Sequence, residues 1–533
     1  PVPAGDNRLL LMNTHPESVM LEITRGDGYE ISELWKSGSI KASYVVPVYH
    51  DGYLYGMNSK IFTCVDAATG ETVWRSREPG DGFPTLVGDH LVIMNKPGTV
   101  RVAEASPEGY REVASLQVFD DHSWSAPAYA NGNLYLRSMS QLARIDLTAG
   151  EGEAGAAQVD WVAGTDFGKF LQALERADDK AKAIDDFLAA QPSFPIIEDS
   201  GAVHFVYRGE GQDVGIVGDM IGFRREDPMK HVAGTDFFHY STRLEPDAAV
   251  SYGFIIDYRE PIPDPRNEAV AEGMFGEVSW FAMPSWRAPD FVAEVESSRQ
   301  GSVETYEWES QLRDEPQVRK ATIYLPTGYE ADSERRYPSL YFFDGGDAIE
   351  NGSLTNILDN LSGERIEPVI AVFVHTDPEK HGGELWEPSQ YIEMVATELV
   401  PAIDAEYRTI DDPGSRAAVG SRNGGDAAFL GGFVHPELFG RVGGLWPVVF
   451  GGEMTQIMPR ADRQPLVVYH TWGTYHMRSP HEAWDQVVEN RAFFEKLRSS
   501  GYRPAGGEVP EGVAWPFFDR YAGEMLMALF PVR

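Results

Sequence analysis

Short apolar segments alternate with polar turn residues along residues 7–147, and the pattern repeats about every 40 residues. Trp35 and Trp74 end successive repeats, and Pro47, Pro84 and Pro127 each stand before a strand. Repeats of this length with four short strands each are typical of β-propeller blades. The sequence therefore predicts that residues 1–150 form a partial propeller of about three to four blades.

The next two regions have different patterns. Residues 151–194 open with a stretch rich in Gly, Ala and Glu, which predicts a linker. Apolar residues then recur at helical spacing in two segments, where Thr165 can cap the first helix and Pro192 can end the second, so we expect an αα-hairpin. Residues 195–298 contain short strands divided by turn residues, which predicts an immunoglobulin-like β-sandwich.

Residues 299–533 alternate apolar strand segments with amphipathic helical segments. A chain that alternates in this way forms a mostly parallel sheet covered by helices, as in the α/β class. We expect strands at 321–326, 339–346, 369–374, 416–420 and 465–470, and helices at 389–407, 425–435, 483–499 and 515–530. The whole chain is therefore predicted to be a multidomain protein.

The composition narrows the possible partners. The chain has 82 acidic and 45 Lys and Arg residues, a formal net charge of −37, so we expect it to bind neither nucleic acid nor anionic membranes. No apolar stretch is long enough for a membrane span. The single Cys64 excludes an internal disulfide framework and a cysteine-based zinc site. The first residues lack signal-peptide features, which fits a cytosolic or a processed chain, and we predict a processed periplasmic or secreted protein.

The segment 67–74, which reads AATGETVW, resembles the signature of pyrroloquinoline-quinone-enzyme-like β-propellers. This resemblance implies a propeller that serves as a scaffold, so we predict no cofactor. Propellers close with about four to eight blades, and an unclosed ring exposes a sheet edge. We therefore expect another protein chain, or a missing N-terminal segment, to complete the ring.

Four segments of the C-terminal region carry a second resemblance. They are 324–329 (YLPTGY), 341–347 (YFFDGGD), 357–361 (ILDNL) and 398–408 (ELVPAIDAEYR). Together they are similar to the enterochelin-esterase-like family of α/β-hydrolases. The segment DPRN at 264–267 resembles the immunoglobulin-like N-terminal domain of such proteins. The resemblance implies an α/β-hydrolase domain at 299–533, ester hydrolysis, and a sandwich at 195–298 that shapes the substrate mouth.

The nucleophile turn of this family departs from its pattern. α/β-Hydrolases place a serine between two glycines in a G-x-S-x-G turn that joins a strand to a helix. Here Gly420 and Gly424 keep the glycine positions, but Arg422 stands where the serine belongs. Ser421 is the fallback nucleophile, although it lies one residue away from the tip of the turn.

The other catalytic positions of the family are also changed. Val513 stands two residues before Trp515, where the resemblance implies a histidine. The segment in which the family carries its catalytic acid reads Thr474, Tyr475 and His476, without a carboxylate. Loss of all three roles would leave only binding. The sequence therefore predicts a pseudo-esterase that acts in binding or assembly.

Arg422 suggests what the altered pocket does. An arginine at a helix start projects a permanent cation, which suits an anionic small molecule or an internal partner such as Asp344 or Asp347. Trp515 is a further candidate for lining this pocket.

Two alternatives remain open. The chain is an active hydrolase of siderophore or carbohydrate esters, acting through Ser421 or through a metal held by His375, His470 and His476. Although we predict no metal site, these three histidines follow strand ends, where α/β sheets bind ligands. The other alternative is a quinone-linked oxidoreductase.

Overall fold

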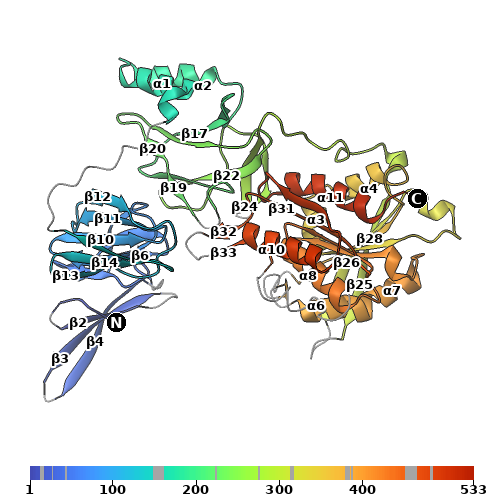
Figure 1. Ribbon diagram of the computed structural model, residues 1–533, viewed down its shortest axis with the longest axis horizontal. Coiled ribbons are helices and arrows are strands. Elements are labelled where there is room, and N and C mark those ends of the chain that lie inside the picture. Colours follow the sequence, from blue (N-terminus) through green and yellow to red (C-terminus); the bar gives the residue numbers. More distant parts are fainter. Residues whose placement is uncertain are drawn as a thin grey trace. The chain divides into compact units, whose positions relative to one another are not determined.

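The computed structural model describes the whole chain except residues 6, 13–16, 27, 42–44, 148–160, 223–224, 274–275, 312–316, 378–383, 386–387, 450–464, 480–483 and 533. The chain divides into two compact units (Figure 1). The first unit is formed chiefly by Pro1–Gly164. The second contains Thr165–Phe223, Met229–Arg478 and Asp485–Arg533.

The first unit contains four antiparallel sheets that follow one another along the chain, one for each predicted repeat. The first sheet contains β1 (Val2–Pro3), β2 (Arg8–Leu11), β3 (Ser18–Arg25) and β4 (Tyr29–Ser37). The second contains β5 (Val48–His50), β6 (Tyr53–Asn58), β7 (Ile61–Asp66) and β8 (Thr72–Ser76). The third contains β9 (Gly82–Val87), β10 (His90–Asn95), β11 (Thr99–Glu104) and β12 (Glu112–Gln117), and the fourth β13 (Ala128–Ala130), β14 (Asn133–Arg137) and β15 (Leu142–Asp146).

Apolar clusters join each sheet to the next, because successive strands turn alternate residues toward their neighbours. The repeated tryptophans add hydrogen bonds between neighbouring sheets. The indole N–H of Trp35 donates to the Ala67 carbonyl at 3.1 Å, and that of Trp74 donates to the Ser106 carbonyl at 3.0 Å. The tryptophan that ends a repeat therefore bonds to the sheet that follows it.

Across the described residues of this unit, the four sheets do not close into a ring. Three successive four-stranded meanders and one of three strands fit the predicted repeat. The assignment to a partial propeller, and the domain boundary at residue 150, stay predictions.

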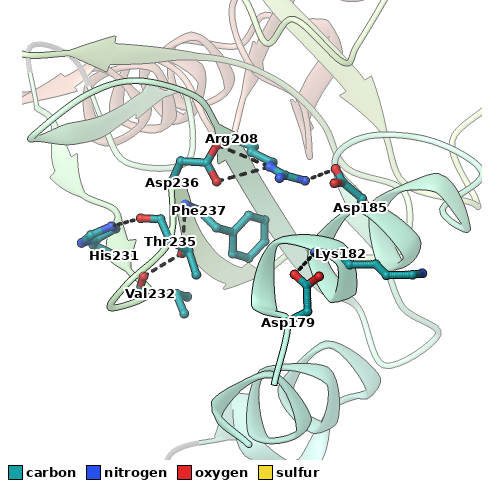
Figure 2. A network of polar contacts seen from close by, with 9 residues as sticks. All are labelled: Asp179, Lys182, Asp185, Arg208, His231, Val232, Thr235, Asp236 and Phe237. Atoms are coloured by element: carbon teal, nitrogen blue, oxygen red, sulfur yellow. Dashed lines mark hydrogen bonds and ion pairs between the residues drawn. The ribbon is translucent and has the colours of Figure 1, made fainter. Parts of the chain in front are cut away.

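Two helices open the second unit, α1 (Asp166–Glu175) and α2 (Lys180–Ala189). The Thr165 hydroxyl accepts the backbone N–H of Gly168 at 2.9 Å, which confirms the predicted helix cap. Figure 2 shows how the second helix is held: Arg208 lies between Asp185 of α2 and Asp236, and its Nε is 3.3 Å from the Asp236 carboxylate. The helical hairpin is thereby fixed to the sheet that carries Arg208.

Two antiparallel sheets pack against each other where the sequence predicts a sandwich, and its immunoglobulin-like class and its bounds at 195–298 stay predictions. One has the order β16 (Ile196–Ile197), β17 (Ala202–Arg208), β21 (Phe237–Arg243) and β20 (Lys230–His231). The other runs through β18 (Val214–Gly218), β22 (Ala249–Ile256), β24 (Gly276–Ala282) and β23 (Val270–Gly273). Buried aromatic residues fill the space between them, with the Phe205 and Tyr252 rings 4.7 Å apart.

An eight-stranded sheet forms the α/β part of the chain. Its order is β25 (Ser302–Ser310), β26 (Gln317–Leu325), β28 (Ile370–Val374), β27 (Ser339–Phe343), β29 (Arg416–Ser421), β30 (Arg441–Leu445), β31 (Val467–Gly473) and β34 (Ala505–Val509). The first three strands pair antiparallel and all later pairs are parallel, which confirms the predicted mostly parallel sheet. Three of these strands, β25, β30 and β34, are absent from the prediction.

Helices cover both faces of this sheet, and an apolar core lies on each side. They are α3 (Gly345–Glu350), α4 (Leu354–Leu361), α6 (Ser389–Met394), α7 (Val400–Glu406), α8 (Arg422–Val434), α10 (Gln486–Ser499) and α11 (Trp515–Leu529). The four predicted helical segments coincide with α6 to α7, α8, α10 and α11. No helix in the described part of the chain is long and apolar enough to cross a membrane.

Candidate functional site

The turn between β29 and α8 has the geometry of a nucleophile elbow. Arg422 lies at its tip with φ of 50°, in the left-handed region that side chains with a Cβ rarely adopt. A Cβ at Gly420 would overlap the carbonyl of Gly424, and a Cβ at Gly424 would overlap the carbonyl of Phe343. Both glycines are therefore required for the chain to turn this tightly, as the sequence pattern predicts.

The hydrogen-bonding groups of the Arg422 side chain have partners only in part. Its Nη1 lies 3.5 Å from an Asp347 carboxylate oxygen, the outer limit of a hydrogen bond, and its guanidinium carbon lies 5.4 Å from the centre of the Phe518 ring. Its Nε and Nη2 are buried and have no hydrogen-bond partner among the described residues. Because buried donors without a partner are costly, the guanidinium keeps hydrogen-bonding capacity that the described residues do not use.

Ser421, the fallback nucleophile, ends β29 and is 2% exposed. Within the described structure, no hydrogen bond joins Ser421 to a histidine. A serine nucleophile must be open to the substrate and lie within hydrogen-bond reach of its base. The elbow therefore presents Arg422, and not Ser421, at its tip.

The loop that carries Val513 is bonded to the sandwich. The Ala249 N–H donates to the Pro510 carbonyl at 3.1 Å, and the Gly512 N–H donates back to the Ala249 carbonyl at 2.8 Å. Val513 is buried beside this pair. Strand β22 of the sandwich thus fixes the segment in which the family resemblance implies a histidine.

A buried carboxylate of the sandwich, Asp219, lies against the same loop. It accepts the Ser251 N–H at 2.6 Å and the Ser251 hydroxyl at 2.7 Å, and a Cβ at Gly512 would overlap its side chain. Burial raises the pKa of Asp219 to about 6, although the backbone amide of Val513 and the charge of Arg422 oppose this rise. Asp219 is absent from the sequence prediction, because nothing in its local pattern indicates that it meets a loop almost 300 residues away.

A second buried carboxylate, Glu511, belongs to the loop itself. It accepts the Trp286 indole N–H at 2.8 Å and the Tyr521 hydroxyl at 3.1 Å. Burial raises its pKa to about 7. Glu511 was also missed, since its sequence context is that of a polar turn.

The three candidate histidines do not gather into one group among the described residues: His470 and His476 are close enough for their charges to interact, whereas His375 lines the cleft. His375 bonds to the Thr322 hydroxyl at 2.8 Å, whereas His470 and His476 are fully buried. Burial lowers the pKa of His470 to about 3 and that of His476 to about 4, so both are neutral at physiological pH. Among the residues that the structure places, no group of histidine, cysteine and acidic side chains could hold a metal ion.

A cleft of about 920 Å³ lies at the carboxyl ends of β27, β28 and β29. It brings together four residues that the sequence singled out, namely Asp344, Asp347, His375 and Arg422. Trp515 lies elsewhere: it is 1% exposed, packs against Phe518 in the core, and does not line the cleft. The cleft is therefore polar and is centred on charged groups.

Two curated relatives cover only part of the chain and part of their own length. The endo-1,4-beta-xylanase/feruloyl esterase of Xylanibacter ruminicola is 27% identical over 281 residues, which are 50% of this chain and 36% of the relative. The uncharacterized protein YjcH of Bacillus subtilis is 26% identical over 158 residues, 28% of this chain and 65% of the relative. The chain thus spans less than two thirds of the length of either.

The crystal structure of the ferric enterobactin esterase of Salmonella typhimurium has a similar fold. The TM-score is 0.53 at 20% identity, and the match covers 65% of this chain and 98% of that chain. These comparisons do not support the quinone-enzyme-like resemblance of residues 1–150. Residues 316–500 match the family model described as "Putative esterase", so the C-terminal region has an esterase-like α/β-hydrolase fold.

Proposed function

We propose that the hydrolase-fold domain binds an anionic group at Arg422 and does not cleave esters by serine chemistry. One observation carries the proposal: the strained tip of the elbow presents a guanidinium whose Nε and Nη2 are buried without a partner in the described structure. In active α/β-hydrolases this tip presents the nucleophile to an ester carbonyl. Here the same position offers hydrogen-bond donors and a positive charge.

The energetics favour an anion at this position. A hydrogen bond to a charged group contributes about 1.5–3 kcal/mol, and a carboxylate or phosphate can accept two parallel bonds from arginine. Asp347, at 3.5 Å, leaves most of this capacity unused. An anionic ligand would therefore replace weak internal pairing with two short charged bonds.

Calorimetric titration with sodium acetate and with inorganic phosphate, at constant ionic strength, tests this proposal. We expect at least one of the two anions to bind, and we expect Arg422→Gln to weaken binding about tenfold or more. Arg498→Gln is the matched control, because Arg498 is an exposed arginine that pairs with Glu495 and does not line the cleft. Equal affinities in the wild type and Arg422→Gln would refute an anion site at the elbow.

Ester hydrolysis is the second candidate, and the comparisons favour it over the pseudo-esterase hypothesis. The match of residues 316–500 to an esterase family supports it. Two relatives support it as well: the name of one includes feruloyl esterase, and the other is a ferric enterobactin esterase. Siderophore or carbohydrate esters would then be the substrates. This candidate needs a nucleophile, and Ser421 is buried, while the described residues hold no group of histidine, cysteine and acidic side chains that could bind a metal ion. Hydrolysis of p-nitrophenyl acetate can be measured with and without a chelator. Activity that the chelator abolishes would support a metal-dependent esterase.

Assembly through residues 1–150 remains part of the proposal. Large apolar side chains are exposed in the first sheet, where Tyr29 and Ile31 are 73% and 66% exposed, and in β15 of the fourth sheet, where Leu142 is 83% exposed. Such side chains suit a protein partner. Sedimentation of the purified chain over a range of concentrations tests for self-association. A periplasmic or secreted location stays a prediction, which cell fractionation tests.

A further inference from the structure

Neighbouring sheets of the first unit pack in one regular way, which the second strand of each sheet shows. In β6, Leu54 belongs to the apolar cluster shared with the first sheet, whereas Tyr55 belongs to the cluster shared with the third. In β10, Leu91 belongs to the cluster shared with the second sheet and Val92 to the cluster shared with the fourth. Alternate residues of a strand lie on opposite faces. The second residue of this strand therefore contacts the preceding sheet, and the third residue contacts the following sheet.

The same arrangement leaves one face of the first sheet open. In β2, the third residue, Leu10, is buried against the second sheet, so the second residue, Leu9, lies on the opposite face. Leu9 pairs with Leu21 of β3. Ile23 of β3 pairs with Ile31 of β4, so apolar side chains continue across the sheet, and none on this face is buried. We call this surface, which contains Leu9, Leu11, Leu21, Ile23, Tyr29 and Ile31, the first-sheet face.

The fourth sheet has an open face of the other kind. In β14, Leu134 and Leu136 are buried against the third sheet, so Tyr135 occupies the position that contacts a following sheet. Tyr55 and Val92 hold this position in β6 and β10 and are 0% and 2% exposed, whereas Tyr135 is 46% exposed. We call this surface, which contains Ala128, Tyr135, Arg137, Leu142, Arg144 and Asp146, the fourth-sheet face.

We propose that the first-sheet face of one copy of this chain packs on the fourth-sheet face of a second copy. Each junction described above joins a face that contacts the following sheet to a face that contacts the preceding sheet. The fourth-sheet face is of the first kind and the first-sheet face is of the second kind, and among the described residues neither is covered by another sheet. The inference rests on the assembly part of the proposed function, and it identifies the partner as a second copy.

The charge of the fourth-sheet face favours this occupant. The chain has a net charge of −37, so two copies repel each other unless the contact carries basic groups. Arg137 and Arg144 outnumber Asp146 on the fourth-sheet face, and neither arginine side chain forms an ion pair or a hydrogen bond with a residue that the structure places. A basic, partly apolar face therefore suits an acidic partner, which a second copy is.

Sedimentation velocity of the purified chain over a range of concentrations tests the pairing. We expect the wild type to associate, and we expect Ile31→Glu and Leu142→Glu each to weaken association at least about tenfold, because each places an unpaired charge in an apolar contact. Both side chains are exposed, so we expect both variants to fold. Val488→Glu, at an exposed apolar position of α10 in the second unit, is the matched control and should associate like the wild type.

An equimolar mixture of the two variants tests the head-to-tail geometry. The two faces differ, so the contact is heterologous. The first-sheet face of Leu142→Glu is intact and can still pack on the intact fourth-sheet face of Ile31→Glu. We therefore expect the mixture to form pairs at a concentration at which neither variant associates alone. Absence of pairs in the mixture, or weakening by only one of the two substitutions, would overturn the inference.

The remaining outcomes separate this inference from the proposed function. Association of the wild type that survives both substitutions would overturn the proposed pairing of faces and leave self-association intact. A wild type that stays monomeric at every concentration would overturn the pairing and self-association together. Neither result changes the anion site at Arg422, because the calorimetric titrations with acetate and phosphate test that site separately.

Discussion

Arg422 is the residue on which the account of the site depends. An arginine in a left-handed conformation costs roughly 1–2 kcal/mol, and the surrounding contacts must hold it there. Strain of this kind is typical of functional turns. It is present here although the residue at the tip, an arginine, is not a nucleophile.

A pair of substitutions measures this strain. Arg422→Gly and Arg422→Ala remove the same charge, but only alanine keeps a Cβ at φ of 50°. We expect Arg422→Gly to be about 1 kcal/mol more stable than Arg422→Ala, as measured by urea unfolding of both variants. Equal stabilities, or a more stable alanine variant, would mean that the backbone at the elbow is unstrained.

At the scale of elements, the loop between β34 and α11 fixes the sandwich to the hydrolase-fold sheet. Glu511 lies in this loop, is 1% exposed, and has a pKa raised by burial from 4.5 to about 7. The folded state therefore holds the proton to a higher pH than the unfolded chain does. The contribution of this proton binding to the free energy of unfolding is therefore largest below about pH 4.5, and it is lost as the pH rises toward 7.

Glu511→Gln tests this linkage. The amide oxygen of glutamine can still accept from Trp286 and Tyr521, but it carries no charge. We expect the variant to be more stable than the wild type at pH 8, by up to about 3 kcal/mol, and to lose this advantage at pH 5. Thermal unfolding at both pH values provides the measurement. An advantage of the same size at pH 5 would show that proton binding by Glu511 is not its cause.

The elements themselves were largely predictable, and the contacts between them were not. The alternation of strands and helices, the Thr165 cap and the two glycines of the elbow follow from local pattern and backbone sterics. Asp219 and Glu511 could not be predicted, because their roles arise only when the sandwich meets the loop at 510–513. The strands β30 and β34 were missed because their glycine-rich sequences, RVGGL and AGGEV, lack the β-branched pattern of a strand.

The whole molecule consists of two compact units, so we expect each to unfold in a transition of its own. Trp74→Phe removes the indole bond to Ser106 in the first unit and should lower one calorimetric transition by about 1 kcal/mol. Trp308→Phe removes an indole bond to Glu398 in the second unit and should lower only the other. A shift of both transitions by either variant would contradict independent units.

The most direct test of the central claim is the intact mass of the wild-type chain after incubation with a fluorophosphonate, which reacts with activated serine nucleophiles. Ser421→Ala is measured in parallel, with an active serine hydrolase as the positive control. The account predicts no phosphonyl adduct on either form of the chain, because Arg422 occupies the tip of the elbow and Ser421 is buried. A stoichiometric adduct on the wild type that is absent from Ser421→Ala would show that serine chemistry takes place at this elbow.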